Sequence, residues 1–417
     1  MMKVLFCGDI LSNFERDNYS RSGIYFVAAS LLKEFCNTRD LRVAIYCSFE
    51  KKPLLERFLQ SRQLELDIIT LKPLLHRRLM VWFTKQNEKR KEEGLKPLRG
   101  RKTLSDICFF LDKFMVGFDA ESFQNFDVFF SPCEAAPYVV EKSGIPIYII
   151  IHDLIPIVTG EFPVRKGYWF YDVLKQVSPE KHYFCISDCT KQDFLRYCPT
   201  ANPKHVKVTY NGYEQKSKSL KEEKAQQIVH DVGLVWNRYI LILGNVVPHK
   251  NVERQINASV RFIKKSGLSD FKIAIVGSVE KKDEVLERAQ VSDDDRDYIV
   301  FCGYVPDDHI EAYYTGAFCL SFTSLYEGFG LPALEAMSVG CPVITSNTSS
   351  LPEVVGDAAI CIPPEDINAH IEAYTRLWND QELRNEFIER GKKRVTNFRW
   401  DMTAKQMIDE MRHGRTV

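Results

Sequence analysis

Two glutamates, Glu327 and Glu335, flank a Gly-Phe-Gly-Leu-Pro turn in the stretch YEGFGLPALEAMSVGCPVITSN. Gly328 and Gly330 permit a sharp turn and a close approach of the backbone to a ligand. Pro332 suits the first turn of a helix. Because the first N–H groups of a helix are unpaired and carry a partial positive charge, this turn could bind a pyrophosphate group. The two carboxylates could then accept hydrogen bonds from hydroxyl groups on either side of it.

The same turn fits the G-x-G-x-x-A form of the dinucleotide fingerprint. A nicotinamide cofactor would also need an acidic residue at the end of the next strand. That strand ends in Ser346 and Asn347, and Glu353 follows only after a serine-rich loop, so this interpretation is disfavoured. Two interpretations stay open on the residues alone. The turn could bind a nucleotide-diphospho-sugar, with the ribose at Glu335 and the sugar at Glu327, or Glu327 is a helix-entry charge and Glu335 a surface residue.

Two other polar features deserve an interpretation at this stage. His152 follows the apolar run IPIYIII, and taken alone it is typical of a structural, hydrogen-bonded histidine. The run SDDDRD over Ser292–Asp297 has aspartates spaced as in metal sites. It lies before another strand and away from the turn, so we interpret it as a solvated loop and expect no metal requirement.

The elements that position these residues follow a regular order. Strand-like runs such as KVLFCG alternate with helix-like runs such as GIYFVAASLLKEF, which predicts an α/β fold with a parallel sheet and helices on both faces. The polar segment 213–237 is interpreted as an interdomain connection. The alternation restarts near Arg238, and FRWDMTAKQMIDEM reads as a terminal amphipathic helix. At 417 residues, two domains are expected.

Composition excludes several classes of protein. The formal net charge is zero, which argues against a nucleic-acid binder. Apolar runs have strand length, too short for a membrane span, and the first residues lack a signal-peptide layout. The 12 cysteines include no C-x-x-C pair, which favours reduced, buried thiols in a cytoplasmic protein.

The basic region Leu74–Lys102 places Trp82 and Phe83 beside many charges. A solvated helix and loop is the simpler interpretation. The alternative is a surface that contacts an anionic membrane or holds a phosphorylated acceptor.

The chain resembles the retaining glycosyltransferases of family 4. YEGFGLPALEAMSVGCPVITSN resembles their E-x7-E signature, and LILGNVVPHKN resembles their phosphate-binding strand and loop. IHDLIPI resembles their histidine-bearing loop, and CISDCTKQDFLRY, VTYNGYE and SSLPEVVGDAAICIPPED resemble further elements in the same order.

The resemblance implies the GT-B fold, in which two Rossmann-like doubly wound domains face each other across a cleft. We expect an acceptor-binding domain over residues 1–212 and a nucleotide-sugar-binding domain over 213–396. A terminal helix over 397–417 would cross back to the first domain.

The resemblance also implies roles for single residues. His152, Glu327 and Lys250 would form the catalytic group. The expected donor-binding residues are Ser22, Gly23, Gly244, Asn245, Lys250, Phe329, Gly330, Leu331 and Glu335. Family members often carry an arginine beside the lysine, whereas Asn245 and His249 stand at the candidate positions here. Lys250 would then bear more of the leaving-group charge, unless His249 is protonated or a distant arginine substitutes.

The resulting functional prediction is a retaining hexosyltransferase that builds a cell-surface polysaccharide such as lipopolysaccharide. GDP-mannose is the preferred donor and UDP-sugars come next, and the acceptor would be a glycan or a lipid-linked glycan. We expect no cofactor, and a cytoplasmic location at the inner face of the membrane. The alternatives are a nucleotide-sugar epimerase or sugar phosphorylase on the same fold, and a non-catalytic scaffold.

Overall fold

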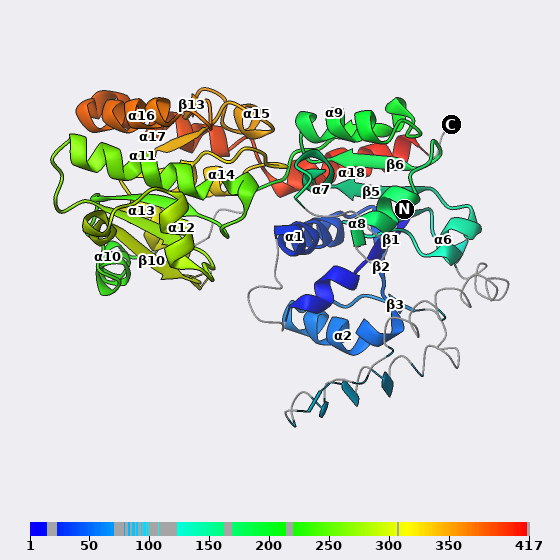
Figure 1. Cartoon of the computed structure of the whole chain (residues 1–417). Coiled ribbons are helices and arrows are strands. Elements are labelled where there is room, and N and C mark those ends of the chain that lie inside the picture. Colours follow the sequence, from blue (N-terminus) through cyan, green and yellow to red (C-terminus); the bar gives the residue numbers. More distant parts are fainter. Residues whose placement is uncertain are drawn as a thin grey trace.

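The computed structural model describes residues 1–14, 23–70, 123–161, 169–213, 220–306 and 308–414, and scattered positions between 79 and 107. Ser22 and most of the region Leu74–Lys102 lie outside the described residues. The described chain forms two parallel sheets, each in its own lobe (Figure 1). This confirms the predicted α/β architecture of two doubly wound domains.

The first sheet has the strand order β3-β2-β1-β4-β5-β6-β7, and each neighbouring pair is parallel. Its strands are β1 (Met2–Cys7), β2 (Leu41–Tyr46), β3 (Ile68–Ile69), β4 (Val128–Ser131), β5 (Ile147–Ile151), β6 (His182–Cys185) and β7 (Val206–Val208). Helices cover both faces, so strands such as β5 are buried on both sides, which explains their continuous apolar sequence. The order of the strands reverses between β1 and β4.

The helices of the first lobe follow from amphipathic spacing and capping. They are η1 (Asp9–Asn13), α1 (Gly23–Asn37), η3 (Phe49–Lys51), α2 (Lys52–Ser61), α6 (Tyr138–Ser143), α7 (Ile155–Val158), α8 (Trp169–Lys175), α9 (Asp188–Tyr197) and η5 (Pro203–His205). In α1 the buried residues Val27, Leu31 and Phe35 recur at helical spacing. Ser187 caps α9, because its side chain accepts a hydrogen bond from the backbone N–H of Thr190 at 3.0 Å.

The second sheet has the order β10-β9-β8-β11-β12-β13 and is also parallel. Its strands are β8 (Tyr239–Leu243), β9 (Lys272–Val276), β10 (Ile299–Gly303), β11 (Cys319–Phe322), β12 (Val343–Ser346) and β13 (Ile360–Ile362). Its helices are α10 (Glu222–Asp231), η6 (Pro248–Lys250), α11 (Val252–Lys265), α12 (Lys282–Arg288), η7 (Asp293–Tyr298), α13 (Ile310–Gly316), α14 (Leu331–Ser338), α15 (Leu351–Val355), α16 (Ile367–Asn379) and α17 (Gln381–Val395).

Two details of this lobe correct the sequence interpretation. The segment 213–237, predicted as a connection, contains α10, which packs against α13. Its buried Ala225 and Val229 give it a core-facing side that its many charges conceal in the sequence. The run SDDDRD is largely exposed, as predicted, but most of it forms a 3-10 helix rather than a loop. Its one buried residue, Asp295, pairs with Lys264 at 2.9 Å.

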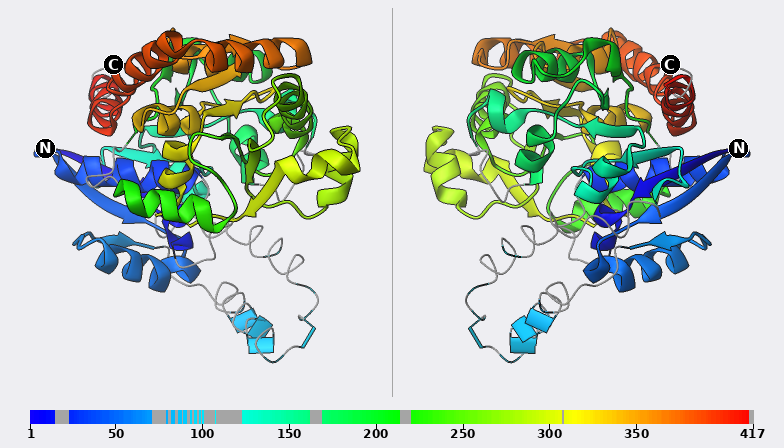
Figure 2. Two further views of the ribbon diagram at one scale, coloured as in Figure 1. Left: turned by 90° about the vertical axis from the view of Figure 1, so that its left-hand side faces the viewer. Right: turned by 90° about the vertical axis from the view of Figure 1, so that its right-hand side faces the viewer.

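The terminal helix α18 (Trp400–His413) returns to the first lobe, as predicted, and packs against α1. Figure 1 and the side views of Figure 2 show it, in red, within the lobe that contains β1. Where the chain returns, the backbone N–H of Tyr213 donates to the carbonyl of Phe398 at 2.9 Å. A Cβ atom on Gly212 would lie 2.4 Å from the backbone nitrogen of Trp400, so the two chain segments are in direct contact.

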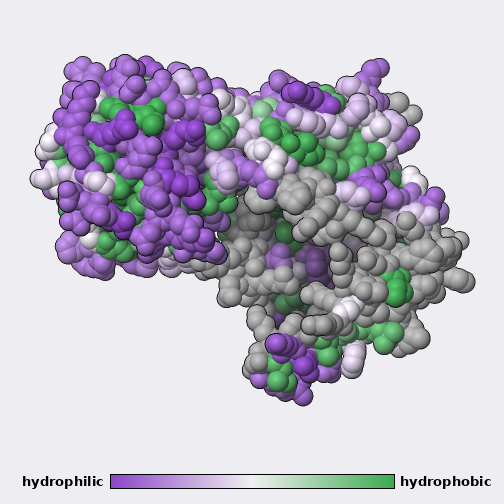
Figure 3. All heavy atoms as spheres, in the orientation of Figure 1, coloured by the Kyte–Doolittle hydropathy of each residue, from purple (hydrophilic) through white to green (hydrophobic). Residues whose placement is uncertain are grey.

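The view in Figure 3 shows a largely hydrophilic surface over the second lobe, with small separate hydrophobic areas. Among the described residues, none of the helices combines the length and apolarity needed to cross a bilayer.

Candidate active site

Glu327 lies at the centre of the site, after strand β11, with an exposed fraction of only 8%. Ser324 Oγ donates to Glu327 Oε1 at 2.6 Å, and Lys250 Nζ donates to the same oxygen at 2.7 Å. Lys250 comes from η6, which follows the neighbouring strand β8. Two of the three predicted catalytic side chains therefore form an ion pair at the carboxyl edge of the second sheet. Removing one partner of such a pair leaves an uncompensated charge, which is strongly destabilising.

The turn after Glu327 has a conformation that requires glycine. Gly330 has a φ of +121°, in the region where other residues are strained. Ser350 fixes the turn from the start of α15, since its Oγ lies 2.9 Å from the carbonyl of Glu327 and 2.8 Å from that of Phe329. Ser349 contributes as well, because its Oγ accepts from the N–H of Glu327 at 3.0 Å. The sequence analysis did not assign a role to either serine.

The turn leads into α14, which begins at Leu331 and has Pro332 in its first turn. The N-terminus of this eight-residue helix follows directly on Gly330. It provides the unpaired N–H groups and partial positive charge that suit a phosphate group. The side chain of Phe329 packs against Phe398, with ring centroids 5.7 Å apart, so only its backbone is available to a phosphate group.

Glu335, one turn into α14, accepts a hydrogen bond from Tyr314 OH at 2.7 Å. Tyr314 comes from α13 and is almost fully buried, and burial and the Glu335 carboxylate raise its pKa well above the usual value. The phenol therefore stays protonated and donates to the carboxylate. This contact fixes the direction of Glu335 but leaves it capacity to accept further hydrogen bonds. Tyr314 carried no recognisable signal in the sequence.

His152 lies at the end of β5, and its side chain is buried. Its Nε2 is 2.6 Å from the carbonyl of Pro132, so Nε2 carries the proton, since a carbonyl can only accept. Burial lowers the pKa of His152 to about 4, and the hydrogen bond to Pro132 offsets this only in part. The ring is therefore neutral near pH 7, which suits a hydrogen-bonding role better than that of an acid.

The histidine loop and the glutamate turn meet, although they belong to different domains. A Cβ atom on Gly328 would lie 2.4 Å from the carbonyl oxygen of His152 and 2.8 Å from Cβ of Asp153. Thr190, near the start of α9, donates to the carbonyl of Gly328 at 3.3 Å. The structure thus places the loop of His152 against the turn that follows Glu327, whose carboxylate pairs with Lys250. The catalytic roles of the three residues stay a prediction.

The remaining predicted donor-binding residues have mixed outcomes. Gly244 has a φ of +130° and lies beside the aliphatic chain of Lys250, with 3.7 Å from its ideal Cβ position to Lys250 Cδ. Asn245 Oδ1 accepts from the N–H of Ser278 at 3.3 Å. Gly23 begins α1 and borders open space. Ser22 lies outside the described residues, so the glycine loop stays a prediction.

The sequence analysis missed a contact that crosses between the domains. His249 Nδ1 lies 2.7 Å from Glu161 Oε2, with side-chain exposures of 8% and 12%. A second cross-domain contact involves Glu353, whose carboxylate accepts from the N–H groups of Asp188 and Cys189 at 2.9 and 3.0 Å. These N–H groups belong to the first turn of α9, where a negative charge is favourable.

A polar cluster also lies at the carboxyl edge of the first sheet. Lys51 Nζ is 3.6 Å from Asp9 Oδ2 and 3.7 Å from Glu134 Oε1. Burial, with the nearby Asp9 carboxylate, raises the pKa of Glu134 to about 7. Asp9 follows β1 and Glu134 follows β4, so the cluster is at the point where the strand order reverses. In open α/β sheets, ligands bind at such points.

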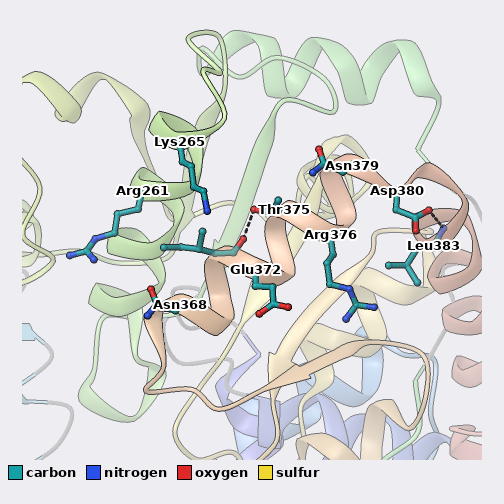
Figure 4. Close-up of a pocket in the computed structure, with 10 residues that line it drawn as sticks. Arg261, Lys265, Asn368, Glu372, Thr375, Arg376, Asn379, Asp380 and Leu383 are labelled. Carbon is teal, nitrogen blue, oxygen red and sulfur yellow. Dashed lines mark hydrogen bonds between the residues drawn. The ribbon is translucent and has the colours of Figure 1, made fainter.

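A hollow of about 880 Å³ lies elsewhere on the second lobe, between α11 and α16 (Figure 4). It is lined by Arg261, Lys265, Asn368, Ile371, Glu372, Thr375, Arg376, Asn379, Asp380 and Leu383. It contains none of the predicted catalytic or donor-binding residues.

Comparison with known proteins covers the part of the chain that contains this site. Residues 234–394 match the model of the family described as glycosyl transferases group 1. The matched residues, called the group 1 domain below after the family model, lie in the second lobe and contain Lys250, Glu327, Glu335 and the N-terminus of α14.

Curated relatives share this part of the chain. The O-antigen chain mannosyltransferase B of Escherichia coli is 34% identical over 176 residues, which cover 42% of this chain and 46% of that protein. The O-antigen chain mannosyltransferase RfbU of Salmonella typhimurium is 25% identical over 260 residues, which cover 62% of this chain and 67% of that protein. The match spans less than half of the Escherichia coli protein, and only 32% of another relative, the serotype-specific mannosyltransferase WbdA of Escherichia coli.

Solved structures resemble the whole chain rather than the group 1 domain alone. Anabaena Alr3699/HepE in complex with UDP and glucose aligns with a TM-score of 0.66 at 15% identity, over 98% of this chain and 99% of that one. WaaG, a glycosyltransferase involved in lipopolysaccharide biosynthesis, aligns with a TM-score of 0.60 at 15% identity, over 97% and 98%. The overall fold is therefore GT-B, with the group 1 domain as its second half.

Proposed function

We propose that this chain is a retaining glycosyltransferase that moves a hexose from a nucleotide-diphospho-sugar to a glycan or lipid-linked acceptor in cell-surface polysaccharide synthesis. The observation that carries the proposal is the ion pair between the half-buried Lys250 and the buried Glu327, beside the N-terminus of α14. GDP-mannose is the proposed donor, with UDP-sugars next. The mannosyltransferases among the relatives support the first, and the complex of Alr3699/HepE with UDP and glucose supports the second.

In the proposed mechanism, the bond between the anomeric carbon and the diphosphate breaks, and negative charge grows on the leaving oxygen. Lys250 and the free N–H groups in the first turn of α14, which begins at Leu331, would stabilise that charge. One such donor is worth about 3–4 kcal/mol. Glu327 would accept hydrogen bonds from the sugar, and Glu335 from the ribose. The leaving phosphate would take the proton of the acceptor hydroxyl on the same face, so no metal and no separate nucleophile is proposed.

The acceptor would approach from the first domain. The cluster of Asp9, Lys51 and Glu134 lies where the first sheet reverses its strand order, and Glu134 is two residues beyond Pro132, the partner of His152. This connects the cluster to His152, which we propose faces the reacting sugar. We propose a location in the cytoplasm at the inner membrane face, with the basic region Leu74–Lys102 in contact with the membrane. Co-sedimentation with liposomes should then increase with the content of anionic lipid.

The direct test is a thermal-shift panel of nucleotide-sugars, since a ligand that binds only the native state raises the melting temperature. The preferred donor should then support transfer to a glycan acceptor. The Glu327→Gln protein should lose at least ~100-fold in kcat, as expected for loss of a preorganised electrostatic contact. Glu365→Gln is a matched control, because its side chain is 74% exposed.

The same assay separates the alternatives. Conversion of the donor in the absence of an acceptor would indicate an epimerase, and dependence on inorganic phosphate would indicate a phosphorylase. A protein that binds no nucleotide-sugar, or a Glu327→Gln protein with full transfer, would overturn the proposed site.

A further inference from the structure

The contact between Glu161 and His249 joins the two domains beside the proposed leaving-group site. Glu161 follows α7 in the first domain, and His249 belongs to η6 in the second. Nδ1 of the histidine is 2.7 Å from Oε2 of the glutamate, and both side chains are nearly buried. A short contact in a buried environment is worth more than a surface pair, because water screens it less.

His249 is also connected to the catalytic turn. It precedes Lys250, whose Nζ pairs with Glu327. Its carbonyl accepts a hydrogen bond from the N–H of Leu325 at 2.7 Å, two residues before Glu327. The carboxylate that faces the histidine ring is Glu161, and Lys250, Glu327 and Asp153 are the other charged groups of this region.

The chemistry of this pair follows from the donor and acceptor atoms. A carboxylate that accepts from Nδ1–H fixes the orientation of the imidazole ring and stabilises its positively charged form. Nε2–H then remains as a second donor. Because the carboxylate belongs to the other domain, this arrangement exists only when the two domains are in contact.

We propose that Glu161 is a positioning residue that orients His249 as a second cation beside Lys250, so that the first domain completes the leaving-group site of the second. This inference rests on the proposed function, because it needs a departing diphosphate. It accounts for the absence of arginine at residues 245 and 249. Domain closure would then do more than exclude water, since it would supply charge to the site.

The test compares the binding of nucleoside diphosphates and monophosphates, GDP against GMP and UDP against UMP, by calorimetry. The terminal phosphate is the group that the second cation would contact. Glu161→Gln keeps a hydrogen-bond acceptor but removes the charge, and His249→Gln keeps a donor but cannot become a cation. Both substitutions should reduce the preference for the diphosphate by about 10-fold, the size of one charge-assisted hydrogen bond.

Kinetics provide the second readout. Both variants should lower kcat for transfer by at least ~10-fold with little change in KM, because the added charge acts mainly on the leaving group. Glu353→Gln serves as the control, since it weakens a different contact between the domains. It should reduce the preference for the diphosphate much less than the other two variants, because a saturating nucleotide closes the domains again.

The outcomes separate the two proposals. If the unmodified protein binds neither diphosphate, the proposed function fails. If it binds them and both variants keep the preference and kcat, the role of Glu161 is wrong. If Glu353→Gln reduces the preference equally, the pair is only a closure contact and the inference is overturned.

Discussion

At the scale of single residues, the site combines charged groups that are fixed by neutral neighbours. Ser324, Ser350 and Tyr314 hold Glu327, its turn and Glu335 in place. On the residues alone the role of the two glutamates stayed open, and it was the resemblance to the E-x7-E signature that indicated them as site residues. The sequence could not predict Tyr314 or Ser350, because a tyrosine in a helix and a serine in a loop are common, and only folding brings them to the carboxylates.

The burial of neutral histidines makes stability depend on pH. Burial lowers the pKa of His152 to about 4, below its usual value in an unfolded chain. Between pH 6.5 and 4 the unfolded chain binds the proton more readily, so the native state loses stability as the pH falls through this window. At higher pH the ring is neutral in both states and the contribution is constant.

The free energy of unfolding of the unmodified protein should fall between pH 7 and pH 4.5. We predict that this fall is smaller in the His152→Gln protein by roughly 2–3 kcal/mol. Denaturant titrations at the two pH values would measure this. Removal of His182, whose pKa is likewise lowered to about 4 by burial, should act in the same direction. Equal pH dependence in the His152→Gln and unmodified proteins would contradict the assignment of a neutral buried ring.

At the scale of elements, the turn before α14 must fit against the loop after β5. This predicts that Gly328→Ala is damaging despite its small size, since the new methyl group would meet the His152 carbonyl at 2.4 Å. Overpacking of this kind costs about 1–3 kcal/mol, which the molecule can relieve by separating the domains. Transfer should fall at least ~10-fold while circular dichroism shows intact secondary structure. Full transfer activity would show that the two loops need not touch.

The terminal helix α18 offers a matched pair of methionines. Met407 is 1% exposed and lies in the core of the first lobe, whereas Met402 on the same helix is 49% exposed. We predict that Met407→Ala lowers the free energy of unfolding by about 2–5 kcal/mol and that Met402→Ala changes it by less than about 0.5 kcal/mol. Chemical denaturation measures both. Similar values for the two would mean that α18 is only loosely attached.

The elements themselves were largely predictable. Apolar runs of strand length alternating with helical periodicity indicated both sheets, and the apolar spacing around Trp400 indicated α18. The charged composition of 222–231 concealed α10, because a helix with two buried residues leaves a weak pattern. The 3-10 helix in SDDDRD was missed because its ion pair with Lys264 is distant in the sequence.

At the scale of the whole molecule, contacts between the domains lie outside what periodicity can predict. In the sequence, Glu353 was considered only as an acid that lies too far along the chain for a dinucleotide site. In the structure it crosses to the first turn of α9 and to Tyr210, whose OH lies 3.1 Å from its carboxylate. No local pattern in the sequence indicates these partners, because Glu353 belongs to the second lobe and α9 to the first.

We predict that Glu353→Gln shifts the protein toward a more open form. The charge at the start of α9 is worth about 0.5–2 kcal/mol, so its loss should raise the open population several-fold. Small-angle scattering should show a larger radius of gyration, and a saturating donor should restore the compact value. Glu389→Gln, on a side chain that is 74% exposed, should have no effect. An unchanged radius would mean that other contacts hold the domains together.

The contact between Tyr213 and Phe398 has a mechanical consequence. The chain passes from one lobe to the other twice, and these two passages lie side by side, with Gly212 against Trp400. Because these two connecting segments are adjacent, they act as one hinge. The lobes should therefore rotate about a single axis rather than slide or twist freely. Phe329 of the glycine turn packs on Phe398 next to that hinge. Rotation of the lobes would therefore move the turn, so the angle between the lobes and the shape of the proposed donor site would change together.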